Sequence, residues 1–169
     1  ADDAEAAAPV VDTDHLRLML GLQQRMKNSR TLVFSTHVTD ITPALRTRSV
    51  AETLREVSSV VSHWSGGTDI GGALALLNRG IVREGSASST VVIVISDGYD
   101  NGSAALIERE MVQLRRHVRQ IVWINPMYGA TTFQVRAAGM RAAMPYIDHF
   151  LPAFDAKSLH VLVRGLSSL

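Results

Sequence analysis

The sequence contains no cysteine, and other common features are also missing from it. Without cysteine the chain can form no disulfide, no thiolate metal site and no cysteine nucleophile. No apolar run approaches the roughly 20 residues that a membrane-spanning helix requires. The formal net charge is only +1, so no strong electric field directs the chain to nucleic acid or to an anionic membrane. We therefore expect a cytoplasmic protein that binds neither nucleic acid nor membrane.

The motifs of several common enzyme classes are missing as well. The histidines are scattered, without the HExxH spacing of zinc proteases. The serines near glycines do not form a GxSxG nucleophile elbow. No Gly-Lys-Ser/Thr completes a phosphate-binding P-loop in the glycine-rich stretch GGTDIGGA. These absences argue against a hydrolase and against a P-loop enzyme.

The length of 169 residues is enough for one domain with a full hydrophobic core. We find no repeat, no low-complexity tract and no linker. We expect residues 1–8 to form a flexible N-terminal arm and residues 9–169 to form a single domain.

Patterns typical of strands alternate with patterns typical of helices along most of the chain. Helices are expected at 14–26, 50–64, 73–83, 105–118, 132–144 and 154–166, and strands at 31–36, 91–96, 120–126 and 146–152. Residues 37–45 suggest a turn or hairpin leading to a further strand that Pro43 stops. Residues 91–96 are apolar on both faces, as expected for a central strand covered by helices. The alternation predicts an α/β fold with a doubly wound, mainly parallel central sheet flanked by helices.

The strand pattern VVIVIS runs directly into Asp97 and Gly98. In open α/β sheets, ligands bind beyond the carboxyl ends of the strands. A carboxylate at that place is partly desolvated and needs a cation or several hydrogen-bond donors. A structural role is the alternative, in which Asp97 closes an Asx turn or caps the helix that starts near Ser103.

The stretch WSGGTDIGG, residues 64–72, predicts a glycine-rich loop before a helix. Its hydroxyl and carboxylate oxygens suit a hard cation such as Mg²⁺ or Ca²⁺. Its glycines could instead expose backbone N–H groups to a phosphate at the helix N-terminus. In a third interpretation, Thr68 or Asp69 simply caps a helix that starts at Ile70.

The GGT loop before a helix, followed by a strand ending in SDG, resembles the von Willebrand factor A (VWA) domain, a Rossmann-like fold. Members of that family assemble a metal-ion-dependent adhesion site (MIDAS) from three loops, with a threonine in the second and an aspartate in the third. Thr68 and Asp97 match these two positions. The blocks WSGGT, SDG and WINP are similar to the CoxE-type VWA proteins, accessory factors like those of carbon monoxide dehydrogenase operons.

The first MIDAS motif of that family, DxSxS after the first strand, is incomplete in this chain. Asp12 occupies the first position, Asp14 stands in place of the first serine and Leu16 in place of the second. The resemblance thus implies that Asp12, Asp14, Thr68 and Asp97 hold Mg²⁺ or another divalent cation, with water in the remaining positions. Two explanations stay open: the metal site is degenerate, or the first motif is missing from this chain.

The resemblance implies a non-enzymatic adaptor that works with a MoxR-type AAA+ ATPase in the maturation or remodelling of a client metalloenzyme. Two alternatives remain. One is a Mg²⁺-dependent phosphatase or phosphotransfer domain, with Asp12 as nucleophile and Asp97 at the metal. The other is a metal-free domain that packs constitutively against a partner.

Overall fold

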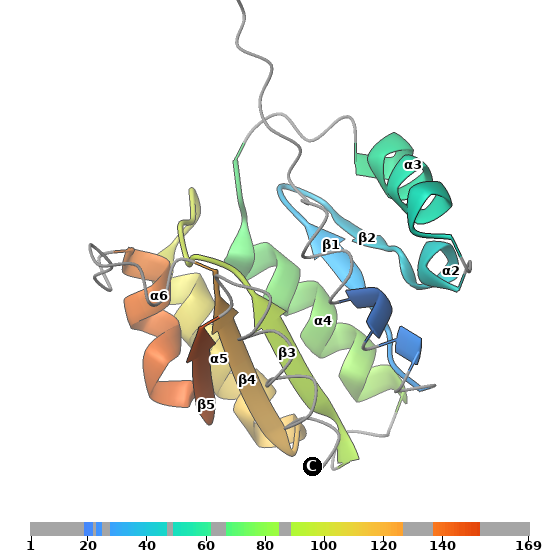
Figure 1. The fold of residues 1–169 in the computed structure, drawn as a ribbon. Helices are drawn as coiled ribbons and strands as arrows, with labels where there is room; N and C mark the ends of the chain where they lie inside the picture. The colour runs from blue at the N-terminus through green and yellow to red at the C-terminus, as the bar shows by residue number, and fades with distance from the viewer. Residues whose placement is uncertain are drawn as a thin grey trace, which may run out of the picture.

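The computed structural model describes residues 19–21, 23–24, 28–46, 49–61, 67–84, 89–126 and 137–152 (Figure 1). The expected N-terminal arm and the expected helix at 154–166 lie outside these residues. The described elements follow one another as β1 (Leu32–Phe34), β2 (Val38–Asp40), α2 (Thr42–Leu45), α3 (Val50–Val61), α4 (Ile70–Glu84), β3 (Val91–Ile95), α5 (Ala104–His117), β4 (Gln120–Asn125), α6 (Ala138–Ala143), the 3-10 helix η2 (Met144–Tyr146) and β5 (His149–Pro152).

Strands β3, β4 and β5 form a parallel sheet in that order. Val91 lies opposite Gln120, and Val122 lies opposite His149. Helix α5 connects β3 to β4, as a parallel crossover requires. The mixed α/β architecture predicted from the sequence is therefore confirmed.

Strand β4 is the enclosed strand of this sheet. Its residues 121–125 are fully buried, whereas β3 alternates between buried and half-buried positions. The pattern at 91–96 predicted that β3 would be the covered central strand. The difference arises because β4 has a hydrogen-bonded strand on each side, whereas the described sheet has β3 at its end.

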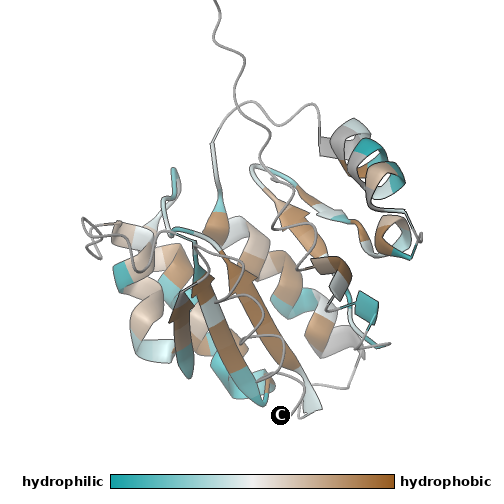
Figure 2. Ribbon diagram, viewed as in Figure 1, coloured by the Kyte–Doolittle hydropathy of each residue, from teal (hydrophilic) through white to brown (hydrophobic). Residues whose placement is uncertain are grey.

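The main hydrophobic core lies between this sheet and helices α4, α5 and α6 (Figure 2). From the strands it includes Val92, Val94, Ile121 and Trp123. The helices contribute fully or almost fully buried side chains: Ile70, Leu74, Ile107, Met111, Leu114 and Met140. On the opposite face of the sheet, Val122 and Ile124 form a smaller cluster with half-buried neighbours on β3 and β5. Such burial on both faces explains why β4 is apolar along almost its whole length.

A second cluster lies beside the β1–β2 hairpin, where Ile41, Leu45 and Val57 are almost fully buried. The hairpin was predicted, with Pro43 as the residue that stops its second strand. Instead, β2 ends at Asp40 and Pro43 lies in the first turn of α2. A proline fits there because first-turn N–H groups have no partner within the helix. Asp40 Oδ1 accepts a hydrogen bond from the Thr42 N–H at 2.9 Å and closes the turn between the two elements.

Candidate functional site

Three segments meet where β3 ends, and backbone hydrogen bonds join them. The Asp69 N–H donates to the Ser35 carbonyl, just after β1, at 2.8 Å. The Asn101 N–H, in the loop after β3, donates to the Thr68 carbonyl at 2.9 Å. The loop before α4 is thus held between the end of β1 and the loop that follows β3. The structure brings the loops of Thr68 and Asp97, both predicted site residues, to the same edge of the fold.

Asp97 is half-buried and closes a turn. Its Oδ1 accepts a hydrogen bond from the Tyr99 N–H at 3.0 Å, the Asx turn expected from the residues alone. Asp97 does not cap α5, because the N-cap is Ser103 and makes no side-chain cap bond. The other carboxylate oxygen, Oδ2, has no hydrogen-bond partner among the described residues. Asp97 therefore keeps one oxygen available at this edge.

The floor of the Asp97 loop is built from β4. Trp123 Nε1 donates to the Ser96 carbonyl at 2.8 Å, and Asn125 Nδ2 donates to the Asp97 carbonyl at 3.3 Å. Both β4 residues are fully buried. A buried donor that loses its acceptor is costly, so these bonds fix the path of the chain around Asp97.

Gly98 is required by this path. Its φ is +81°, a left-handed conformation in which side chains are disfavoured. A Cβ at this position would also lie 2.6 Å from the Cβ of Met140 on α6. Helix α6 also approaches the loop closely at Gly139, where an added Cβ would lie 2.8 Å from the Gly98 carbonyl oxygen. Two glycines thus let α6 pack directly beneath the loop.

The loop before α4 has its own left-handed glycine, Gly67, with φ +88°. A side chain there would collide with Asn101. Asp69 Oδ1 accepts the Gly72 N–H at 2.7 Å and caps α4, which confirms the capping role considered for Asp69. Helix α4 consequently starts at Ile70, as the capping interpretation predicted, and not after residue 72, where the glycine-rich pattern ends. Thr68 is half-buried, and its hydroxyl makes no hydrogen bond with the described residues.

Asp100 is a residue of this edge that sequence reasoning did not single out. Its Oδ1 accepts the Ile70 N–H at 2.6 Å, and its Oδ2 accepts the Gly102 N–H at 3.0 Å. One carboxylate therefore closes its own turn and satisfies a free N–H at the start of α4. The D-x-G spacing in DGYDNG indicates the turn. The bond to Ile70, thirty residues away, has no local sequence signal.

Comparison with known proteins decides the family. The model of the family described as VWA domain containing CoxE-like protein matches residues 12–159. The chain belongs to this family. A search of curated proteins gave no match.

Among solved structures, this VWA domain is similar to the crystal structure of an aerotolerance-related membrane protein from Bacteroides fragilis NCTC 9343 with multiple mutations to serines. The TM-score is 0.56 at 15% sequence identity, over 92% of this chain and 88% of that one. At this identity the likeness supports the fold alone. Within the described residues, no helix of the VWA domain is long and apolar enough to cross a membrane.

The oxygen donors of this VWA domain suit a hard divalent cation. The Thr68 hydroxyl and the Asp97 Oδ2 are the ligand types that Mg²⁺ prefers. Asp12 and Asp14, the other two predicted ligands, lie outside the described residues. In the part of the chain that the structure describes, no three His, Asp or Glu side chains gather as a metal site. Thr68 and Asp97 are thus the two predicted ligands that the structure describes.

An exposed aromatic ring stands beside these donors. Tyr99 follows Gly98 directly, and 65% of its surface is accessible. An aromatic side chain so exposed is suited to contact with another protein. Trp64, the other aromatic residue noted near the predicted loops, lies outside the described residues.

Proposed function

We propose that this VWA domain binds partner proteins at the edge where β3 ends, through a divalent cation. Thr68 and Asp97 would supply two ligands, with Asp12 and Asp14 completing the set on the protein side. A carboxylate of the partner would then reach the cation, and Tyr99 would contact the surrounding surface. A charged contact of this kind confers specificity because it is stronger in a partly desolvated site than in water.

The observation that carries the proposal is the hydrogen bond between Asn101 N–H and the Thr68 carbonyl. It holds together two loops that are distant in sequence and that carry the threonine and aspartate of the family's motif. The buried β4 donors beneath the Asp97 loop would hold that loop in place before a ligand arrives. A preorganised site loses less conformational entropy on binding.

Membership of the CoxE-like family supports a protein-interaction role, and we extend that role as follows. The domain would serve as a non-enzymatic, cytoplasmic adaptor for a MoxR-type AAA+ ATPase. The ATPase would supply the mechanical work, and the VWA domain would hold the client metalloenzyme during its maturation or remodelling.

The first test is thermal unfolding of the chelated protein with and without millimolar Mg²⁺, Mn²⁺ or Ca²⁺. An ion that binds only the folded state raises the melting temperature. At a free ion concentration of a hundred times Kd, it raises the free energy of unfolding by about 2.7 kcal/mol. Asp97→Asn keeps an oxygen that can accept the Tyr99 N–H, but it removes the charge. We expect the ion-dependent rise in the wild type and its loss in Asp97→Asn.

Glu52→Gln is the matched control, since Glu52 is an exposed carboxylate on α3. It should retain the full ion-dependent rise. If no ion raises the melting temperature, the proposed cation site is refuted and the domain is a metal-free interaction domain. A rise that persists in Asp97→Asn would place the ion elsewhere on the protein.

A further inference from the structure

Strand β3 lies at the end of the parallel sheet, and one of its edges has no neighbouring strand among the described residues. The Thr90 carbonyl and the Ser96 N–H both form hydrogen bonds on the side of β4. Because backbone groups alternate in direction along a strand, those of Ile93 and Ile95 point to the opposite side. This edge also lacks the charged side chains and the proline that commonly protect the edge of a sheet.

Strand β1 has an edge of the same kind. The Thr31 carbonyl and the Ser35 N–H form hydrogen bonds on the side of β2. The backbone groups of Leu32 and Phe34 therefore point away from β2, where the described part of the chain places no strand. All three side chains of β1 are half-buried. Each of the two sheets thus has an apolar strand at its end.

The edges of β1 and β3 belong to one layer of the fold. Phe34 packs against the main core, to which β3 contributes two side chains. The Thr68–Asp69 peptide group accepts a hydrogen bond from the Asn101 N–H, after β3, and donates one to the Ser35 carbonyl, after β1. A peptide group bonded on two sides is what a strand places between two neighbours, about 4.8 Å from each. The segments that follow β1 and β3 are thus held about one strand's width from each other.

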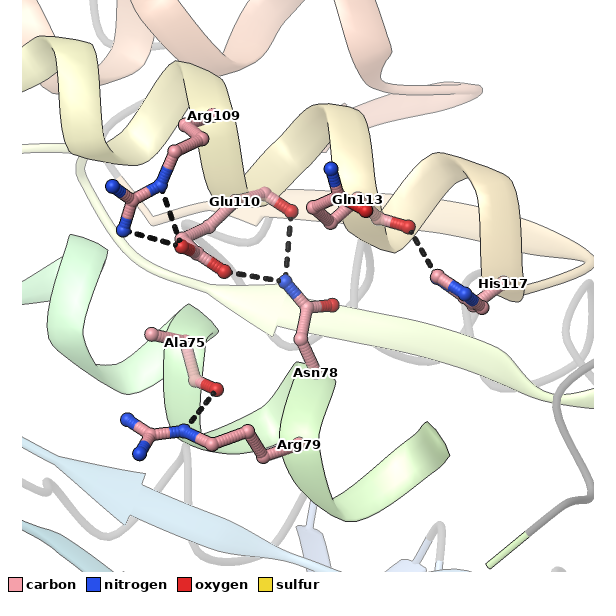
Figure 3. A pocket seen from close by; sticks show the side chains of 7 residues that line it. All are labelled: Ala75, Asn78, Arg79, Arg109, Glu110, Gln113 and His117. Carbon is pink, nitrogen blue, oxygen red and sulfur yellow. Dashed lines mark hydrogen bonds and ion pairs between the residues drawn. The ribbon is translucent and has the colours of Figure 1, made fainter. Parts of the chain in front are cut away.

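Helix α4 packs against this layer through one apolar stripe. Asn78 Nδ2 fixes α4 on α5, because it donates to the Glu110 carbonyl and to Glu110 Oε2, each at 2.9 Å (Figure 3). The stripe has helical spacing and consists of Ile70, Leu74, Leu77 and Ile81. Three of these side chains are buried, but Leu77 is only half-buried. The described layer therefore leaves part of the apolar stripe uncovered.

We propose that residues 9–12 form a strand between β1 and β3, which joins the two sheets into one. Val10 and Val11 are the only β-branched residues among the first twelve. The others there are chiefly alanine and acidic residues, which are depleted in strands. Pro9 suits the first position of a strand, where its missing N–H is tolerated.

The chain has the length that this arrangement needs. Met19 and Leu20 are buried in the second cluster, against which Val33 of β1 packs. Asp12 precedes Met19 by so few residues that it lies within about 25 Å of Met19. Residues 13–31 would form the connection to β1, and they exceed the roughly twelve residues that a crossover between parallel strands requires.

Such a strand would bring Asp12 to the proposed cation. Strands β1 and β3 both end at the edge that carries Thr68 and Asp97, so a parallel strand between them ends there too, with Asp12 as its last residue. For this role of Asp12 the inference rests on the proposed function. The pairing itself requires no cation, and it is tested in the presence of a chelator.

Amide hydrogen exchange, followed by NMR on the full chain, tests the pairing residue by residue. The Ile93 and Ile95 N–H groups should be protected from exchange in the wild type. Val11→Pro should abolish this protection, because proline cannot pair within a central strand. The amides of Val92 and Val94, which face β4, should stay protected in the variant. Glu5→Pro is the matched control: it lies in the expected N-terminal arm and should leave all four amides protected.

Disulfide cross-linking is the second test, and the absence of cysteine from the chain makes it free of background. Ile93→Cys and Ile95→Cys are each combined with Val10→Cys or with Val11→Cys. Opposite residues of neighbouring strands lie within the 4.4–6.8 Å between Cα atoms that a disulfide spans, and side chains alternate between the faces of a sheet. We therefore expect cross-linking with one of the two valine positions and its loss with the other.

The proposal is overturned if the Ile93 and Ile95 amides of the wild type exchange as fast as unprotected amides. It is also overturned if Val11→Pro retains their protection, or if both valine positions or neither cross-link. If cross-linking alternates as expected but no ion raises the melting temperature, the strand is confirmed and the cation site alone is refuted.

Discussion

Substitution of Gly98 by alanine tests whether the Asp97 loop has the geometry described. At φ +81° an alanine costs roughly 1–2 kcal/mol relative to its preferred backbone conformations. Its Cβ would also lie 2.6 Å from the Met140 Cβ, and overpacking of this kind typically costs about 1–3 kcal/mol. The neighbour cannot easily yield, because Met140 is 1% exposed and belongs to the main core. We expect Gly98→Ala to lower the free energy of unfolding by about 2–5 kcal/mol.

Substitution of a second glycine, Gly80, is the control, because it should change the stability in the opposite direction. Gly80 lies inside helix α4, and a Cβ there would meet no atom of the described residues within 4 Å. Alanine in a helix interior is favoured over glycine by about 0.8–1 kcal/mol, so Gly80→Ala should stabilise the protein by about that amount. The same chemical change is therefore expected to destabilise at one position and stabilise at the other.

Urea unfolding followed by circular dichroism measures both variants, and the slope of the transition shows whether unfolding remains two-state. In thermal scans, each kcal/mol should shift Tm by about 2–4 °C in a chain of this size. A Gly98→Ala protein within roughly 0.5 kcal/mol of wild type would refute the assigned conformation, because changes of that size are typical of unconstrained surface positions.

Two further predictions concern buried polar contacts. Trp123→Phe removes the 2.8 Å hydrogen bond to the Ser96 carbonyl and should cost about 1–3 kcal/mol in urea unfolding, whereas an unchanged midpoint would show that the bond does not hold the loop. The pKa of Glu110 is lowered below its usual value of 4.5 in the folded state, chiefly by the Asn78 hydrogen bond. Its stabilising contribution should therefore be fully present above pH 4.5 and be lost as the pH falls through the lower folded-state pKa. In Glu110→Gln this part of the acid dependence of stability should be absent, and an acid transition identical to that of wild type would contradict the assignment.

Much of the fold follows from local pattern. The apolar runs at 91–96 and 120–126 correspond to β3 and β4, and the helical periodicity at 105–118 corresponds to α5. Local pattern indicated β3 as the most enclosed strand, because 91–96 is apolar up to Ser96, whereas the structure encloses β4. That property depends on the order β3-β4-β5, which is set by contacts between segments distant in sequence. Pro43 illustrates the same limit, because a proline is compatible both with the end of a strand and with the first turn of a helix.

The site was partly predictable for a different reason. Ligand sites in open α/β sheets lie beyond the carboxyl ends of strands, so Asp97 could be assigned to this edge from its position after β3. Thr68 precedes a helix and was assigned to the same edge only through the resemblance to the VWA family. Asp100 could not, since its role depends on the approach of α4 to the loop after β3. Asn78 and Glu110 were also not predicted, because each lies inside an ordinary amphipathic helix. Their pairing appears only when α4 and α5 are packed together.

The contacts that hold the Asp97 loop determine what a substitution of Asp97 measures. The bonds that fix the loop run from the side chains of Trp123 and Asn125 to main-chain carbonyls, and Gly98 packs against α6. None of these contacts uses the Asp97 carboxylate, whose hydrogen bond to the described residues is the local one to the Tyr99 N–H. Asp97→Asn should therefore leave the fold and its stability nearly unchanged while removing the charge. A loss of ion or partner binding in that variant would report on the carboxylate itself, whereas the same loss in Gly98→Ala would report on the shape of the loop.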